Sequence, residues 1–160
     1  MRLTTIILLI VINFIASGQS LTGKYNAYYG HSLELKDDST FRYEWHFDLA
    51  SSWSVGQWKV SSKTIYLNFK SIYDTLTRDG MPDSLVLSSD EKSNRIRNDE
   101  FVIGLISGGG QGRSVNGITD RLAIRGKRLY QLDKIGRIIR TRESGNWTKK
   151  KKPTYYFRAS

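Results

Sequence analysis

The sequence lacks cysteine altogether and contains only two prolines and two histidines among its 160 residues. The absence of cysteine excludes disulfides, thiolate metal ligands and a lipid-carrying cysteine. A zinc site needs three or four converging ligands, which two histidines alone do not supply. We therefore expect no metal centre and no cofactor, and a fold whose stability comes from its core.

The first twenty residues follow the layout of a secretory signal. Arg2 precedes an apolar run from Ile6 to Ile15, and the small residues 16–18 follow that run. A run of about ten residues is half of what a membrane-spanning helix needs, so we expect no stable transmembrane anchor. Residues 1–20 are predicted to be a signal peptide and residues 21–160 a single exported domain. Because small secreted domains of animals commonly rely on disulfides, the lack of cysteine favours a bacterial protein that is secreted or periplasmic.

Positive charge is concentrated in the last third of the chain. Residues 1–110 carry 11 Lys and Arg against 12 Asp and Glu, whereas residues 111–160 carry 14 against 3. On an exported protein this excess favours docking to an anionic glycan, lipopolysaccharide or membrane surface, and argues against nucleic acid as a partner. The alternative is that these side chains only solvate the outer faces of strands. The predicted contact residues are Arg137, Arg140, Arg142, Lys149, Lys150, Lys151 and Lys152.

Alternation with a period of two residues dominates the chain after residue 20. It is clearest at residues 40–48, whose aromatic side chains would share one face of a strand. A preceding strand at 31–36 would join it through a turn at 37–39. The resulting register sets Leu35 opposite Phe41, Leu33 opposite Tyr43 and His31 opposite Trp45. It leaves His46 on the other face, so the two histidines would point apart.

The rest of the chain is predicted to consist of short strands and loops. Residues 90–100 and the glycine tract 107–112 are expected to be loops, and residues 143–153 a mobile basic link. About eight to ten strands joined by hairpins predict an all-β antiparallel meander, closed into a barrel or a strongly curled sheet. The further strands are predicted at 53–60 with a bulge at Gly56, 64–70, 74–78, 83–88, 101–106, 121–124, 128–133, 137–142 and 154–157.

Several segments carry a resemblance to a known group of domains. They are GKYNAYYG (23–30), LELKDDSTFRYEW (33–45), SSWSVGQWKVSSKTIYLNF (51–69), RLYQLDKIGRIIRTR (128–142) and KKPTYYF (151–157). In this order they resemble the lipocalin-like small β-barrel domains of secreted Bacteroidetes proteins. The resemblance covers half to two-thirds of the exported part. It implies a lipocalin-like barrel and export, and it assigns no chemistry, because these motifs are packing and turn signals.

No catalytic constellation stands out in the sequence. Ser107 lies in a G-x-x-S-G context rather than G-x-S-x-G, and no histidine follows it. The aromatic residues of the predicted strands could line an apolar cavity or fill a packed core, and barrels of this size do either. We expect a non-enzymatic binding protein that holds a small apolar or amphipathic ligand inside the barrel, or alternatively a module that docks to an anionic surface. The predicted ligand-binding residues are Tyr43, Trp45, Trp53 and Trp58.

Overall fold

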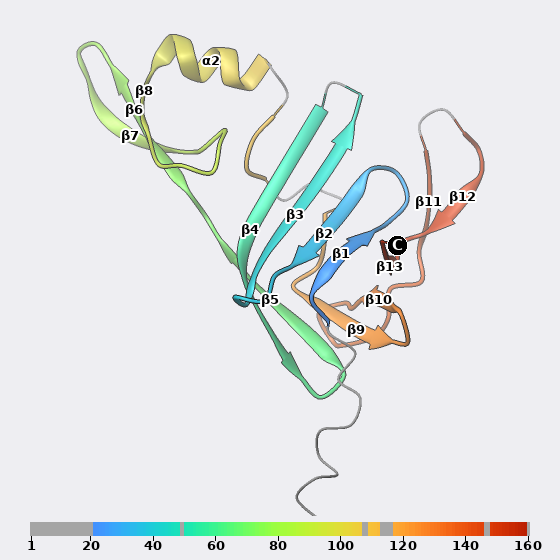
Figure 1. Ribbon diagram of the computed structural model, residues 1–160. Helices are drawn as coiled ribbons and strands as arrows, with labels where there is room; N and C mark the ends of the chain where they lie inside the picture. The colour runs from blue at the N-terminus through green and yellow to red at the C-terminus, as the bar shows by residue number, and fades with distance from the viewer. Residues whose placement is uncertain (1–20, 49, 107–108, 113–116, 146–147, 160) are drawn as a thin grey trace, which may run out of the picture.

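Eight antiparallel strands close into a barrel in the order β1-β13-β10-β9-β5-β4-β3-β2 (Figure 1). The computed structural model describes residues 21–48, 50–106, 109–112, 117–145 and 148–159, so the predicted signal peptide lies outside the described residues. The predicted all-β barrel is confirmed. Its strands are β1 (Gly23–Asn26), β2 (His31–Leu35), β3 (Thr40–Phe47), β4 (Ala50–Ser61), β5 (Thr64–Lys70), β9 (Arg121–Arg125), β10 (Arg128–Gln131) and β13 (Tyr156–Arg158).

The hairpin of β2 and β3 has the predicted register. Leu35 pairs with Phe41, Leu33 with Tyr43 and His31 with Trp45. In the turn, the carboxylate of Asp38 accepts hydrogen bonds from both the backbone N–H and the hydroxyl of Thr40. This short polar turn leaves the buried faces of both strands on the same side, which fixes the register.

Side chains from the strands of the barrel meet in one buried cluster inside it. Leu33, Ile65 and Leu122 are completely shielded from solvent, and Trp58 packs against the cluster from β4. The cluster occupies the barrel interior, which is the packed alternative for a barrel of eight strands. Its members are Tyr25, Leu33, Leu35, Phe41, Tyr43, Ile65, Leu67, Ile118, Leu122, Leu129 and Tyr156.

Gly56 does not mark a bulge, because β4 runs in unbroken register against both of its neighbours. A Cβ atom at this position would lie 2.0 Å from the carbonyl oxygen of Asn68 and 2.8 Å from the ring of Phe41. The Phe41 ring in turn meets Phe69 edge to face, with centroids 5.2 Å apart. Glycine is therefore required here for close packing rather than for a change of strand direction.

Residues 71–106 and 109–112, between β5 and the segment that leads to β9, form a separate small unit that we call the insertion. It contains the hairpin of β6 (Tyr73–Arg78) and β7 (Met81–Leu87), the strand β8 (Arg95–Arg97), which is parallel to β6, and the helix α2 (Asn98–Ile106). Figure 1 shows the helix and these three strands projecting from one side of the barrel. The predicted strands at 74–78 and 83–88 thus exist, but they lie outside the barrel.

Two predictions for the insertion are wrong. The expected strand at 101–106 is helical, and the expected loop at 90–100 contains β8 and the start of α2. The acidic Asp99 and Glu100 lie in the first helical turn, and the Glu100 carboxylate accepts a hydrogen bond from the backbone N–H of Arg97 at 2.8 Å. These contacts cap the helix and outweigh the strand propensity of its β-branched residues.

The C-terminal region also departs from the prediction. Of the expected strand 137–142, only Arg142 is in a strand, because β13 occupies the place beside β10. The expected basic link 143–153 contains most of a hairpin instead, formed by β11 (Arg142–Ser144) and β12 (Lys151–Pro153). The late basic residues are therefore partly organised on a hairpin that lies outside the barrel sheet.

Candidate ligand-binding cavity

The four predicted ligand-binding residues do not share one site. Tyr43 lies in the barrel core, and Trp45 and Trp58 are half-buried and pack against that core. Along β4, Trp58 alternates with Gly56 and Ser54 on the inward face, whereas Trp53 pairs with Glu44 on the outward face. The structure therefore places Tyr43 in the core, Trp45 and Trp58 against it, and Trp53 outside the barrel.

Trp53 joins the barrel to the insertion. Its indole N–H donates to the carbonyl of Ser89 at 3.1 Å, and its backbone N–H donates to the carbonyl of Gly110 at 3.2 Å. Gln111 completes this connection, because its side chain accepts from the backbone N–H of Ile72 and donates to the carbonyl of Lys70. The side chain of Trp53 is buried by these contacts. Ser89, Gly110 and Gln111 of this connection also line the cavity described next.

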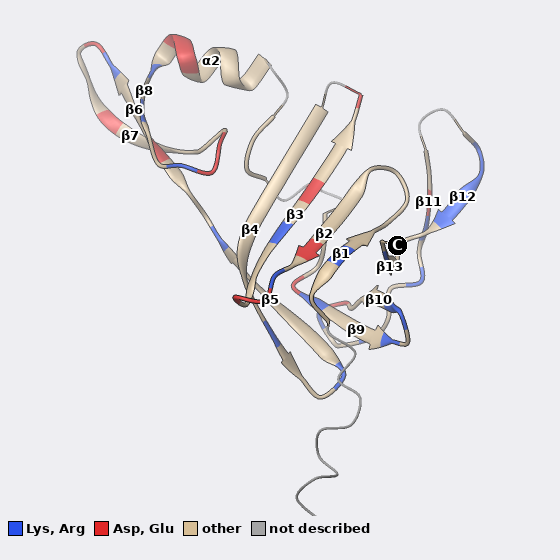
Figure 2. Ribbon diagram, viewed as in Figure 1, with Lys and Arg blue, Asp and Glu red and all other residues tan. Residues whose placement is uncertain are grey.

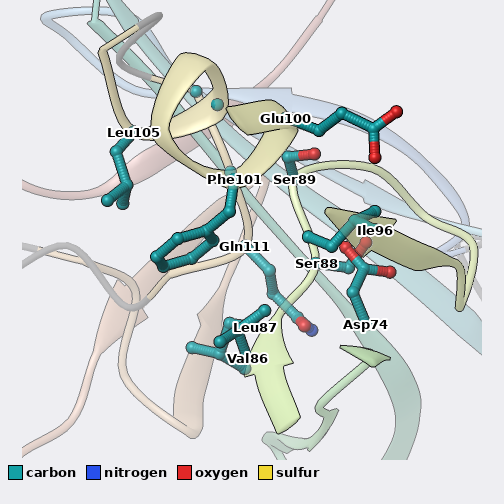
Figure 3. A pocket seen from close by; sticks show the side chains of 13 residues that line it. Asp74, Val86, Leu87, Ser88, Ser89, Ile96, Glu100, Phe101, Leu105 and Gln111 are labelled. Carbon is teal, nitrogen blue, oxygen red and sulfur yellow. The ribbon is translucent and has the colours of Figure 1, made fainter. Parts of the chain in front are cut away.

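A cavity of about 460 Å³ lies between α2, the strands β6, β7 and β8, and the Gly110 loop (Figure 3). Figure 3 shows the Phe101 ring projecting from the helix toward Leu87 and Val86, with Leu105 beside it. Its walls are formed by Asp74, Val86, Leu87, Ser88, Ser89, Ile96, Glu100, Phe101, Gly104, Leu105, Gly109, Gly110 and Gln111.

The helix α2 has an incompletely covered apolar surface. None of its residues is buried, and Leu105 and Ile103 are each 66% exposed. Across the cavity, Leu87 of β7 is also exposed. Apolar surface left in water near a concave site is typical of a place where another molecule binds.

The cavity was not predicted from the sequence, because the segment that forms its helix was predicted to be a strand. Phe101 and Leu105 are four residues apart, so they share one face of the helix, on which both line the cavity. The signal that would have revealed the helix is the acidic pair at residues 99–100 with Glu100 three residues after Arg97. The cavity itself has no sequence signal, because its lining comes from segments far apart in the chain.

Two polar groups of the lining are already satisfied. The Ser88 hydroxyl donates to the carbonyl of Lys92 at 2.9 Å, and the Gln111 side chain is hydrogen-bonded to the backbone of Ile72 and of Lys70. Asp74 differs from them: it is 2% exposed, and its Oδ1 accepts one hydrogen bond, from the backbone N–H of Asn94 at 2.8 Å. The cavity thus combines an apolar wall with a buried carboxyl group.

A second polar cluster lies inside the barrel. His31 Nδ1 and the hydroxyl of Tyr43 share a hydrogen bond of 2.7 Å, and His31 is 8% exposed. Burial lowers the pKa of His31 and raises the pKa of Tyr43, of Tyr156 and of Glu143. These shifts keep all four groups neutral over a wider pH range.

The described residues contain no group of three or more His, Asp or Glu side chains placed to hold a metal ion. His46 is exposed, on the face of β3 opposite to Tyr43. Ser107, the failed nucleophile candidate, lies outside the described residues. Among the helices of the described part, none has the length and apolar character needed to cross a membrane.

The predicted anionic-surface residues are divided between two places. Arg142, Lys151 and Lys152 belong to β11 and β12, where Figure 2 shows a concentration of positive charge, and Lys149 and Lys150 immediately precede β12. The ammonium group of Lys152 lies 4.8 Å from the ring centroid of Tyr28. Arg137 pairs with Asp133 at 3.0 Å in the loop after β10, and the exposed Arg140 follows in the same segment.

Comparison of the chain with protein-family models, with curated proteins and with solved structures found no match.

Proposed function

We propose that this chain is an exported, non-enzymatic protein that binds a small apolar or amphipathic ligand in the cavity under α2. The observation that carries the proposal is the cavity itself, about 460 Å³ in volume with apolar walls from the helix and two strands. Sites for small molecules commonly have volumes of roughly 300 to 1,000 Å³ and combine such walls with a few polar groups. The secretory layout of residues 1–20 supports export.

The packing of the barrel supports a ligand site under α2 rather than one in the barrel interior. The predicted interior site consists of Tyr43, Trp45, Trp53 and Trp58. Tyr43 is part of the core, Trp45 and Trp58 pack against it, and Trp53 lies on the outward face of β4. A ligand under α2 displaces no core side chain. It instead covers apolar atoms of Leu105 and Leu87, which are exposed without it.

Titration with the neutral fluorescent dye Nile red tests the proposal. We expect saturable binding with one dye per chain. Leu105→Ala should raise the Kd about 5- to 30-fold, because the lost apolar contact contributes about 1–2 kcal/mol. The matched control is Ile103→Ala, since Ile103 is as exposed as Leu105 and does not line the cavity. Non-saturable binding, or equal effects of the two substitutions, would contradict the proposal.

A second candidate function is docking to an anionic surface through the basic C-terminal region. One observation favours it: Arg142, Lys149, Lys150 and Lys151 are all exposed and lie on or beside the β11–β12 hairpin. Such clusters attract anionic headgroups with about 1 kcal/mol for each basic residue near the membrane surface.

Sedimentation with vesicles that contain phosphatidylglycerol tests this second function. Lys150→Glu combined with Lys151→Glu should abolish binding at low salt. The control pair Lys59→Glu and Lys63→Glu changes the charge equally at exposed positions near the β4–β5 turn. Binding that survives 1 M salt would contradict an electrostatic mechanism, because the screening length there is about 3 Å.

A further inference from the structure

Asp74 is the feature of the cavity that an apolar ligand alone leaves unexplained. The residue lies on β6, is 2% exposed, and lines the cavity near Ser88 and Ile96 (Figure 3). The one hydrogen bond that its carboxyl group accepts from the described residues comes from the backbone of Asn94. An ionised carboxylate offers about four acceptor sites, so most of this capacity is unused.

No cation of the described residues forms an ion pair with Asp74. The arginines of the insertion bind other groups: Arg95 pairs with Asp83, Arg97 pairs with Asp99, and Arg78 donates a hydrogen bond to the side-chain oxygen of Asn98. A buried carboxylate without a counter-charge is strongly unfavourable, far more so than a buried neutral polar group. A positive charge brought by the ligand would remove this penalty.

The charge of the residues around the cavity also favours a positively charged ligand. The ionisable residues of its lining are Asp74 and the exposed Glu100, and none of the lining residues is Lys, Arg or His. Residues 71–110 carry 7 Asp and Glu against 4 Lys and Arg. The ring of Phe101 adds an aromatic face, which attracts organic cations. An anionic amphiphile such as a fatty acid would bring its carboxylate next to Asp74 and be repelled.

We propose that the ligand is an amphipathic organic cation, namely an apolar body that carries a protonated amine. The apolar body contacts Phe101, Leu105 and Leu87, and the ammonium group donates its hydrogen bonds to the Asp74 carboxylate. This inference rests on the proposed function, because it concerns the same cavity. It adds the chemical class of the ligand and the residue that recognises its charge.

Calorimetric titration with three probes of one shape tests the inference. The probes are 2-phenylethylamine, 2-phenylethanol and 3-phenylpropanoate, which present a cation, a neutral group and an anion on the same body. We expect the amine to bind the protein at least about tenfold more tightly than the alcohol, as for a charge-assisted hydrogen bond, and the acid to bind most weakly. Equal binding of the amine and the alcohol would overturn the inference.

Asp74→Asn is the decisive variant, because the amide keeps the shape and can still accept the hydrogen bond from Asn94. It should bring the affinity of the amine to within about twofold of the alcohol, as expected if the preference is electrostatic, and leave the alcohol unchanged. The control Glu100→Gln removes the same charge from the exposed edge and should have a smaller effect. An amine preference that persists in Asp74→Asn would overturn the role of Asp74.

The outcomes separate this inference from the proposed function. Nile red binding that depends on Leu105, together with no preference for the amine, would leave the proposed function standing and overturn the inference. Absence of saturable binding by every probe would overturn both. If the Asp74→Asn variant also fails to bind the alcohol, the substitution has disrupted the insertion. The order of the affinities of the three probes for the unmodified protein then decides whether the inference holds.

Discussion

The barrel buries its apolar side chains more completely than the insertion does, although Leu76 of β6 is fully buried. Leu33, Leu122 and Leu129 of the barrel are at most 1% exposed, whereas Leu85 and Leu105 of the insertion are 69% and 66% exposed. The strands of the barrel bury one whole face in the barrel interior. The three-stranded sheet of the insertion has one short helix to cover it. Stability is therefore concentrated in the barrel, and surface available for binding in the insertion.

The largest expected effect comes from the barrel core. Leu122→Ala should reduce the free energy of unfolding by about 2–5 kcal/mol, because it removes buried contacts and leaves a cavity. Leu85→Ala makes the same chemical change on the exposed face of β7 and should cost less than about 0.5 kcal/mol. Urea unfolding followed by tryptophan fluorescence measures both. Similar midpoints for the two variants would contradict the division between the regions.

A pair of glycine substitutions tests the same comparison at the backbone. Gly56→Ala should destabilise the protein by about 1–3 kcal/mol, since its new methyl group meets the Asn68 carbonyl and the Phe41 ring. Gly104→Ala should instead stabilise α2 by up to about 1 kcal/mol, because its nearest neighbour is 3.9 Å away and alanine favours a helix. Hydrogen exchange measured at β4 and at α2 would report the two effects separately. A loss of protection in α2 would contradict the predicted stabilisation by Gly104→Ala.

The same contrast explains which parts of the structure the sequence predicted. The barrel strands were predictable because one buried face imposes a period of two residues, and the turn at Asp38 fixed the register of Leu33 opposite Tyr43. The segment 101–106 has no such alternation, and its Val and Ile residues favour strands by propensity. Its helical state depends on a local cap and on its contacts with β6 and β8.

The cavity was not predictable for a different reason. Asp74 precedes Phe101 by 27 residues and Gln111 by 37, so only the tertiary arrangement brings the three together. Trp53 was predicted to bind a ligand inside the barrel, but its direction depends on whether Gly56 introduces a bulge. The structure shows that it does not.

The pH dependence of stability should follow the barrel through His31. Burial lowers its pKa in the folded state below the ordinary value of 6.5, so the unfolded chain binds a proton at higher pH than the folded chain does. The stability contributed by neutral His31 is therefore present above pH 6.5 and is lost as the pH falls below it toward the folded pKa.

His31→Asn isolates this effect, because its side-chain oxygen can still accept a hydrogen bond from Tyr43 but does not titrate. Relative to this variant, the unmodified protein should lose stability between pH 7.5 and pH 5, measured by urea midpoints. Glu143 has the opposite sign, since its raised pKa favours the folded state as the pH falls toward 4.5. It contributes to both proteins and cancels in the difference. Parallel pH profiles would contradict the assignment to His31.

The smallest expected effect concerns the ion pair that joins the two regions. Arg42 of β3 pairs with Glu91 of the insertion, and both side chains are partly exposed to solvent. Exposed pairs contribute at most about 1 kcal/mol, so Glu91→Gln should shift the urea midpoint only slightly, and the shift should disappear at 1 M salt. The connection through Trp53 has its indole and backbone hydrogen bonds buried beside the barrel wall, so it should hold the insertion in place without the ion pair. If Glu91→Gln instead abolished binding of Nile red, the position of the insertion would depend on surface charge, and the cavity would be a less rigid site than its hydrogen bonds indicate.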